Sequence, residues 1–209
     1  MMAPAADPAP LGLAAFALTT FLLSAANAHW MTKATGDAWL GFAFAYGGLG
    51  QFAAAMWEFR NRNVFGATAF GTYAGFWIGL GLWFLLVLPP PTGAGPLAAA
   101  AHAAAAGKDL GWILLAFAIF NTYMLLWSTQ VNAAVFGVFL TLEATEVILF
   151  IGFFAANTTI IKIGGYVGVL TALVAWYTSA AGVINGMRGT PLVPVGKPFG
   201  ARQEARQAA

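Results

Sequence analysis

Six long apolar blocks constrain this chain more than any other feature. A run of about 18 or more apolar residues can cross the ~30 Å hydrocarbon core of a bilayer as an α-helix. Barrel strands alternate polar and apolar residues over about ten positions, and these blocks are continuously apolar for longer. Lipid cannot satisfy free backbone groups, so we expect helices. The blocks run approximately over residues 11–31, 38–57, 67–88, 110–127, 131–155 and 160–184.

The composition supports an all-α integral membrane protein with six transmembrane helices. Hydrophobic residues make up 60% of the chain and charged residues only 8%, whereas soluble domains carry about 25% charged residues. The net charge is +2 and there is no cysteine. We therefore expect the lipid bilayer as a partner, no nucleic acid, no disulfide and no thiolate metal site. No Lys or Arg precedes the first block, so we expect that block to be retained rather than cleaved as a signal peptide.

The expected organisation is one transmembrane domain over residues 11–186, with an arm over 1–10 and a polar, mobile tail over 187–209. Residues 89–109 are expected to form the longest loop, because three consecutive prolines end the third block.

Six crossings place both termini on one side, and the basic residues indicate which side. Cytoplasmic loops carry an excess of Lys and Arg. We therefore predict cytoplasmic termini in the plasma membrane, or in the inner membrane of a Gram-negative cell. The side of the termini collects Arg60, Arg62, Arg188, Lys197, Arg202 and Arg206, and the other side collects Lys33, Lys108 and Lys162.

Glycines recur at helical spacing in two of the blocks. Gly71, Gly75 and Gly79 lie four residues apart, and Gly164, Gly165 and Gly168 are also close together. Such faces let helices approach closely. We expect most of them to pack within one protomer, and the alternatives are a subunit interface or a pore wall.

Enzyme motifs are absent. The chain has no H-E-x-x-H metal helix, no G-x-S-x-G elbow and no phosphate-binding loop. His29 is expected at a helix end and His102 in the long loop, where neither shares a metal site. The sequence therefore predicts no metal, no cofactor and no catalytic residue, and favours passive or ion-coupled transport.

One motif near the N-terminus is specific. Asp7 suits a helix N-cap and Pro8 the first helical turn, which any helix could use. The whole string, however, resembles the N-P-A-P-L-G-L signature of the acetate uptake transporter family, also called succinate–acetate permeases, with Asp in place of Asn. It comprises Asp7, Pro8, Ala9, Pro10, Leu11, Gly12 and Leu13. Residues 46–48 with Gln51, residues 58–59, 63–70 and 192–196 also resemble stretches of that family.

The resemblance implies a fold, an assembly and a transport path. Members have six transmembrane helices per protomer, form hexamers, and move acetate and in some cases succinate, either with protons or as an anion channel. A Phe, a Tyr and a Leu form a constriction in each protomer. The matching residues are Phe16, Tyr73 and Leu140.

A path for acetate needs an apolar constriction for the methyl group and hydrogen-bond donors for the carboxylate. Each donor could instead bond a neighbouring helix, an interaction worth about 0.6 kcal/mol on average. The candidates are Thr19, Thr20, Asn27, Gln51, Thr72, Asn121 and Thr141.

Two acidic residues in the fifth block depart from the family, where these positions are usually apolar. Acidic groups within a membrane mark ion pathways or find partners. Glu143 follows Leu140 by three residues, about 60° around the helix. The hypothesis is that Glu143 couples transport to pH, whereas Glu146 faces other helices or protomers. The alternative is a purely structural pair, and an ionised Glu143 would repel an anion.

The sequence therefore predicts a transporter or channel for acetate, and for succinate or other short carboxylates. An ammonium or ammonia exporter and a membrane sensor without flux remain as alternatives, which flux measurements separate.

Overall fold

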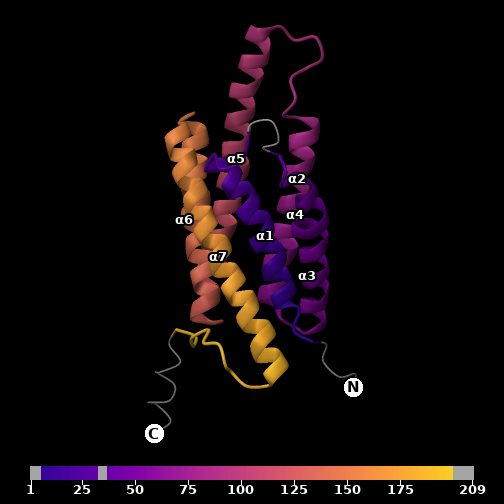
Figure 1. The fold of residues 1–209 in the computed structure, drawn as a ribbon, viewed down its shortest axis with the longest axis vertical. Coiled ribbons are helices and arrows are strands. Elements are labelled where there is room, and N and C mark those ends of the chain that lie inside the picture. Colours follow the sequence, from indigo (N-terminus) through magenta and orange to yellow (C-terminus); the bar gives the residue numbers. More distant parts are fainter. Residues whose placement is uncertain (1–5, 33–36, 200–209) are drawn as a thin grey trace.

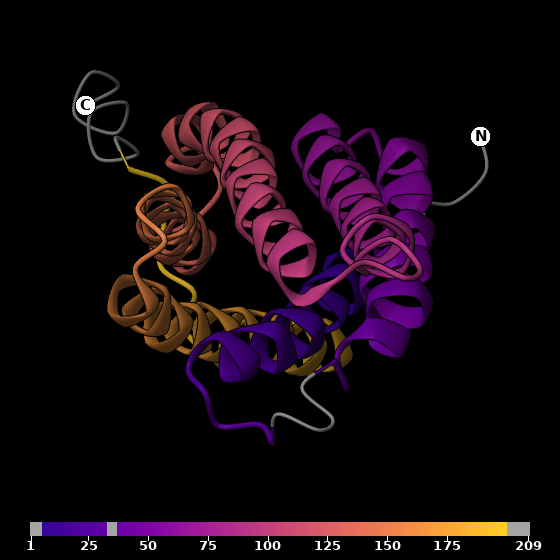
Figure 2. The same ribbon diagram turned by 90° about the horizontal axis from the view of Figure 1, so that it is seen from above.

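A computed structural model describes residues 6–32 and 37–199, and these residues form a bundle of long helices (Figures 1 and 2). Five of the described helices are long and apolar enough to cross a membrane. They are α1 (Ala9–Asn27), α4 (Val64–Leu86), α5 (Pro96–Ser128), α6 (Ala133–Phe154) and α7 (Thr158–Arg188).

The second apolar block forms the sixth pass from three consecutive helical pieces. They are α2 (Leu40–Phe42), the π-helix η2 (Ala43–Gly50) and α3 (Gln51–Arg60). The wider π-helical turns carry Gly47, where an added Cβ would lie 2.7 Å from the Trp77 ring and 2.8 Å from Thr19. This stretch of bare backbone therefore lets side chains of α1 and α4 approach the second pass.

Successive passes alternate in direction. In Figure 1, α1, α4 and α6 run upward, while α3, α5 and α7 run downward. The start of α1 and the end of α7 consequently lie at the same end of the bundle, as six crossings require. Arg60 ends α3 and Arg188 ends α7 at that end, and Arg62 lies in the connection between α3 and α4. Lys33, Arg202 and Arg206 fall outside the described residues.

The prediction of a loop over residues 89–109 is wrong from residue 96 onward. α5 begins at Pro96, and its first turns project beyond the other helices (Figure 1). Proline is well suited to a first helical turn, and the Ala-rich residues 97–106 have the highest helix propensity. His102 therefore lies in a helix, where its Nε2 is 2.9 Å from the carbonyl oxygen of Val87.

The tail is not free over its described part. The side chain of Asn185 accepts hydrogen bonds from the backbone N–H groups of Leu192 and Val193, at 2.8 and 2.9 Å. Further on, Val195 O accepts from Ala134 N at 2.9 Å, and the Phe199 ring packs edge-on against Phe136. The expected mobile tail is thus anchored as far as Phe199, because the half-buried amide of Asn185 caps the turn that follows α7.

The two sets of glycines differ in their surroundings. An added Cβ at Gly165 of α7 would lie 2.8 Å from the backbone of both Asn27 and Ser24 in α1. Cβ atoms at Gly75 and Gly79 of α4 would meet nothing within 4 Å. The expectation of packing within the protomer therefore holds for Gly165 and is wrong for Gly75 and Gly79.

Replacing glycine by alanine should therefore have different effects at a closely packed position and at an open one. Gly165→Ala should destabilise the protomer by roughly 1–3 kcal/mol, because backbone atoms of α1 must move. Gly186→Ala is the matched control on the same helix, because an added Cβ there would meet nothing within 4 Å. It should be neutral or stabilise the protomer by up to about 1 kcal/mol through helix propensity. Thermal unfolding of the two purified variants in detergent measures both effects, and equal melting temperatures would contradict the close approach of α1 and α7.

Candidate functional site

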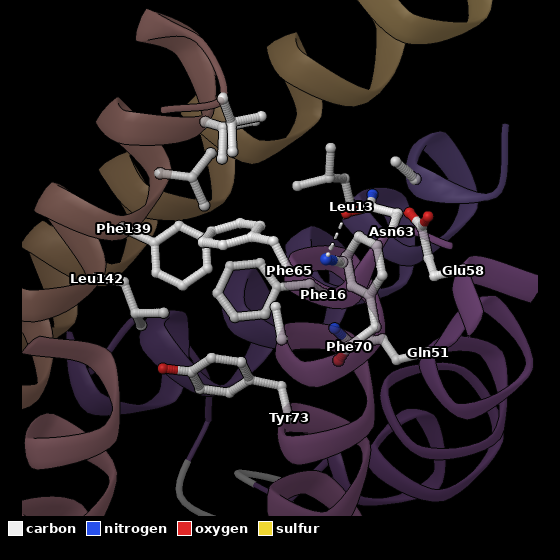
Figure 3. A pocket seen from close by; sticks show the side chains of 16 residues that line it. Leu13, Phe16, Gln51, Glu58, Asn63, Phe65, Phe70, Tyr73, Phe139 and Leu142 are labelled. Carbon is white, nitrogen blue, oxygen red and sulfur yellow. Dashed lines mark hydrogen bonds between the residues drawn. The ribbon is translucent and has the colours of Figure 1, made fainter. Parts of the chain in front are cut away.

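Three cavities lie one above another inside the bundle. The lower cavity, of about 80 Å³, lies between the starts of α1, α4 and α6 and the end of α3. Its wall is formed by Ala9, Leu13, Phe16, Gln51, Glu58, Asn63, Phe65, Gly66, Ala69, Phe70, Tyr73, Val131, Val135, Val138, Phe139 and Leu142 (Figure 3). A middle cavity of about 40 Å³ and an upper cavity of about 330 Å³ follow toward the other end.

Each cavity has lining residues in common with the next one along the bundle. The lower and middle cavities share Phe16, Tyr73 and Leu142. The middle and upper cavities share a second set, which consists of Leu23, Asn27, Leu114 and Leu149. The cavities therefore form one column through the protomer. We call Phe16, Tyr73 and Leu142 the neck, because they separate its two lower parts.

The neck draws one side chain from each of α1, α4 and α6. Phe16, Tyr73 and Leu142 are 4–6% exposed. The rings of Phe16 and Tyr73 pack edge to face with their centroids 5.6 Å apart. Further rings on α5 surround Tyr73, including Phe117 and Phe120 at 6.1 and 5.6 Å. The neck is thus an apolar partition held by aromatic packing.

The assignment of Leu140 to this constriction does not agree with the structure. Leu140 is 48% exposed and lines none of the three cavities. Leu142 takes its place, since two residues turn an α-helix by about 200° and so reverse the direction of the side chain. Phe16 and Tyr73 do lie together, as the resemblance implied.

The signature motif positions the start of α1 beside the lower cavity. Asp7 Oδ1 accepts a hydrogen bond from the Ala9 backbone N–H at 2.9 Å, in the first turn of the helix. Ser179 of α7 donates to the Pro10 carbonyl at 2.6 Å. Ala9 and Leu13 then line the lower cavity. The motif therefore both begins the helix and joins it to α7.

Three of the seven polar candidates line the column. Thr20 lines the middle cavity, Asn27 lines the middle and upper cavities, and Gln51 lines the lower one. Thr19 and Thr141 donate to carbonyls of their own helices instead.

The two remaining candidates do not line the column. Thr72 is half-buried and lies outside all three walls. Asn121 is fully buried outside the walls, and its Nδ2 donates to Phe139 O at 3.0 Å.

The sequence hypothesis placed Glu143 beside the path and Glu146 against other helices, whereas in the structure Glu146 is the acid that lines the column. Glu146 is 3% exposed and lines the middle cavity, where the Tyr73 hydroxyl donates to its Oε1 at 3.2 Å. Glu143 lines none of the three cavities and accepts from Asn121 Nδ2 at 2.7 Å and from Thr122 Oγ1 at 2.8 Å. Because the neck leucine is Leu142, the acid one turn further on, Glu146, faces the column.

Two residues that the sequence did not indicate as site residues also line the lower cavity. Glu58 is 1% exposed and lines the lower cavity together with Asn63, whose Oδ1 accepts from the Gly66 backbone N–H at 3.1 Å. Both lie at the far side of the cavity from Tyr73 (Figure 3). Both residues lie in stretches that resemble the family, and this resemblance is the sequence feature that could have identified them. Within residues 6–32 and 37–199, no group of His, Cys, Asp and Glu could hold a metal ion.

Comparison with known proteins places this architecture in a family. Residues 2–196 match the model of the GPR1/FUN34/yaaH family. The chain is 38% identical to acetate permease A of Emericella nidulans over 91% of its own length, although it spans only 65% of that protein. It is 32% identical to the succinate-acetate/proton symporter SatP of Escherichia coli, covering 92% of this chain and 96% of that one. A solved structure of the bacterial acetate channel SatP superposes with a TM-score of 0.80 at 30% identity, covering 92% and 99% of the two chains.

The neck predicts a selectivity change at one leucine and not at its neighbour. Leu142→Ala should widen the neck and raise the rates for lactate and succinate relative to acetate by roughly tenfold or more, because the missing carbons relieve a steric limit. Leu140→Ala removes the same atoms from an exposed position and should leave selectivity unchanged. Solute uptake into liposomes containing each folded variant tests this, and the same selectivity in both variants would place the limiting contact elsewhere.

Proposed function

Because this chain belongs to the GPR1/FUN34/yaaH family, a family of membrane transporters and channels, we propose that it moves acetate across the plasma membrane. Succinate and other short carboxylates are the further substrates of this proposal. The protein is a transporter or channel rather than an enzyme. The observation that carries the proposal is the column of three cavities, which share walls from one end of the protomer to the other.

The chemistry of the column fits a small carboxylate. An apolar neck accommodates a methyl group and opposes the passage of a hydrated ion, which must lose water there. Side chains that can donate hydrogen bonds line the column on both sides of the neck. Gln51 lies below it, and Thr20 and Asn27 lie above it.

Purified protein in liposomes tests this function. We expect uptake of labelled acetate that exceeds the leak of protein-free liposomes, together with slow uptake of labelled methylammonium. The reverse result would favour an ammonium or ammonia exporter. Absence of both fluxes, from protein that remains folded, would favour a membrane sensor.

We also propose that the protomers assemble as a hexamer, each with its own column. The exposed glycine face of α4 supports an assembly, because a Cβ added at Gly75 or Gly79 would meet nothing within 4 Å among the described residues, and small residues favour close helix contacts. Native mass spectrometry of the purified protein should give six chains per particle, and a monomeric mass would contradict this.

The termini are proposed to lie in the cytoplasm, and the chain suits a direct test because it has no cysteine. Lys197→Cys places one thiol at the end that carries the termini. Ala94→Cys places another thiol in the loop between α4 and α5, at the opposite end. In intact cells, a membrane-impermeant thiol reagent should label Ala94→Cys and spare Lys197→Cys. The opposite labelling pattern would invert the topology.

A further inference from the structure

Three polar side chains lie one helical turn above the neck. Thr20, Trp77 and Glu146 each follow a neck residue by four positions, and all three line the middle cavity. Four residues advance an α-helix by about 6 Å and return the side chain to nearly the same face. Since α1, α4 and α6 run in the same direction (Figure 1), the three side chains form a second level. We call them the polar layer.

Each member of the polar layer has a buried polar atom without a hydrogen-bond partner. These atoms are Thr20 Oγ1, Trp77 Nε1 and Glu146 Oε2. The side chains are only 6%, 2% and 3% exposed. Buried polar groups are nearly always paired in folded proteins, and one left unpaired is destabilising. Three such atoms around one cavity indicate a ligand that supplies their partners.

Whether each of these three atoms can donate or accept a hydrogen bond indicates which class of ligand fits the site. An indole N–H can only donate, and a threonine hydroxyl can donate. A carboxyl group donates only when it carries a proton. Two or three donors among the side chains that line one small cavity suit a carboxylate. With Glu146 ionised, the same cavity would repel that anion.

We propose that the polar layer binds the carboxylate of the substrate together with one proton, and that Glu146 is the group that carries the proton. This inference rests on the proposed function and assigns its coupling to a residue. In the occupied site, Trp77 Nε1–H, Thr20 Oγ1–H and the protonated Glu146 carboxyl donate to the two oxygens of the substrate.

The surroundings offer no other charge to balance the anion. The described residues that line the middle cavity include no Lys, Arg or His. Tyr73 from α4 donates to the other oxygen of Glu146, and Glu143 lies one turn away on α6. Uncharged groups complete the surroundings: Ser24 of α1 and Leu114 of α5 line the cavity, η2 brings Gly47 against Trp77, and the hydroxyl of Thr171 on α7 bonds to that of Thr145.

Release of the substrate can complete the coupling by one proton transfer. The O–H bond of Glu146 breaks as an O–H bond forms on the substrate carboxylate, and the neutral acid leaves. Glu146 remains ionised until it takes a proton from water, and only then does the site accept another anion. One proton thus accompanies each carboxylate.

Glu143 is less suited to this role. Both of its carboxylate oxygens already accept hydrogen bonds, from Asn121 of α5 and from Thr122. It lines none of the three cavities. It therefore provides a matched control, an acidic residue on the same helix that joins α5 to α6 outside the column.

Calorimetric titration of acetate into the purified protein counts the protons directly. Repeating the titration in buffers of different ionisation enthalpy gives the number of protons taken up per acetate bound. At a pH at which both acetate and the Glu146 of the empty protein are ionised, the wild-type protein should take up about one proton. Glu146→Gln keeps a donor of the same shape without a titrating group, so it should bind acetate with no proton uptake. Glu143→Gln should behave as the wild type.

A second variant tests the site without touching the acid. Trp77→Phe removes one N–H donor and should weaken acetate binding by roughly tenfold or more, with proton uptake unchanged. Size-exclusion chromatography in detergent checks that each variant keeps its fold.

The outcomes separate this inference from the proposed function. Unchanged proton uptake in Glu146→Gln, its loss in Glu143→Gln, or unchanged affinity in Trp77→Phe would each overturn the inference while the wild-type protein still transports acetate. Wild-type protein that neither binds nor transports acetate would overturn the proposed function, and the inference with it.

Discussion

The parallel direction of α1, α4 and α6 is the constraint on which the rest of the site depends. Lipid requires every crossing to be helical, and short connections make successive crossings alternate in direction. The first, third and fifth passes therefore present their residues in the same vertical order. As a result Phe16, Tyr73 and Leu142 meet at one depth, and the residues four positions later meet one turn above them.

Tyr73 connects the apolar and polar parts of the column. Its ring packs against Phe16 in the neck, while its hydroxyl lies 3.2 Å from both Asn121 Oδ1 and Glu146 Oε1. Asn121 in turn donates to Glu143, so a hydrogen-bonded group joins α4, α5 and α6. Buried acids are destabilising unless they are bonded, and this group supplies bonds to three of the four carboxylate oxygens of Glu143 and Glu146.

Much of the fold could be predicted from hydropathy alone, because the bilayer leaves a chain few choices. The five spanning helices and the second pass fall on the six apolar blocks. The errors in where helices and loops lie fall outside the hydrocarbon region, where water allows either loop or helix. There, the propensity of the Ala-rich residues 97–106 extended α5, and the side chain of Asn185 ordered the tail.

By itself, the sequence determined the class of the protein, the number of its passes and its family resemblance, and that resemblance implied the pairing of Phe16 with Tyr73. Only the tertiary structure decided that Leu142 rather than Leu140 completes the neck and that Glu146 rather than Glu143 faces the column. The physical reason is that a membrane helix such as α6 is apolar both where it would meet lipid and where it packs on its neighbours, so periodicity does not mark the side that faces the path. That side is chosen by the neighbouring helices, through contacts between residues as distant in the chain as Tyr73 and Glu146.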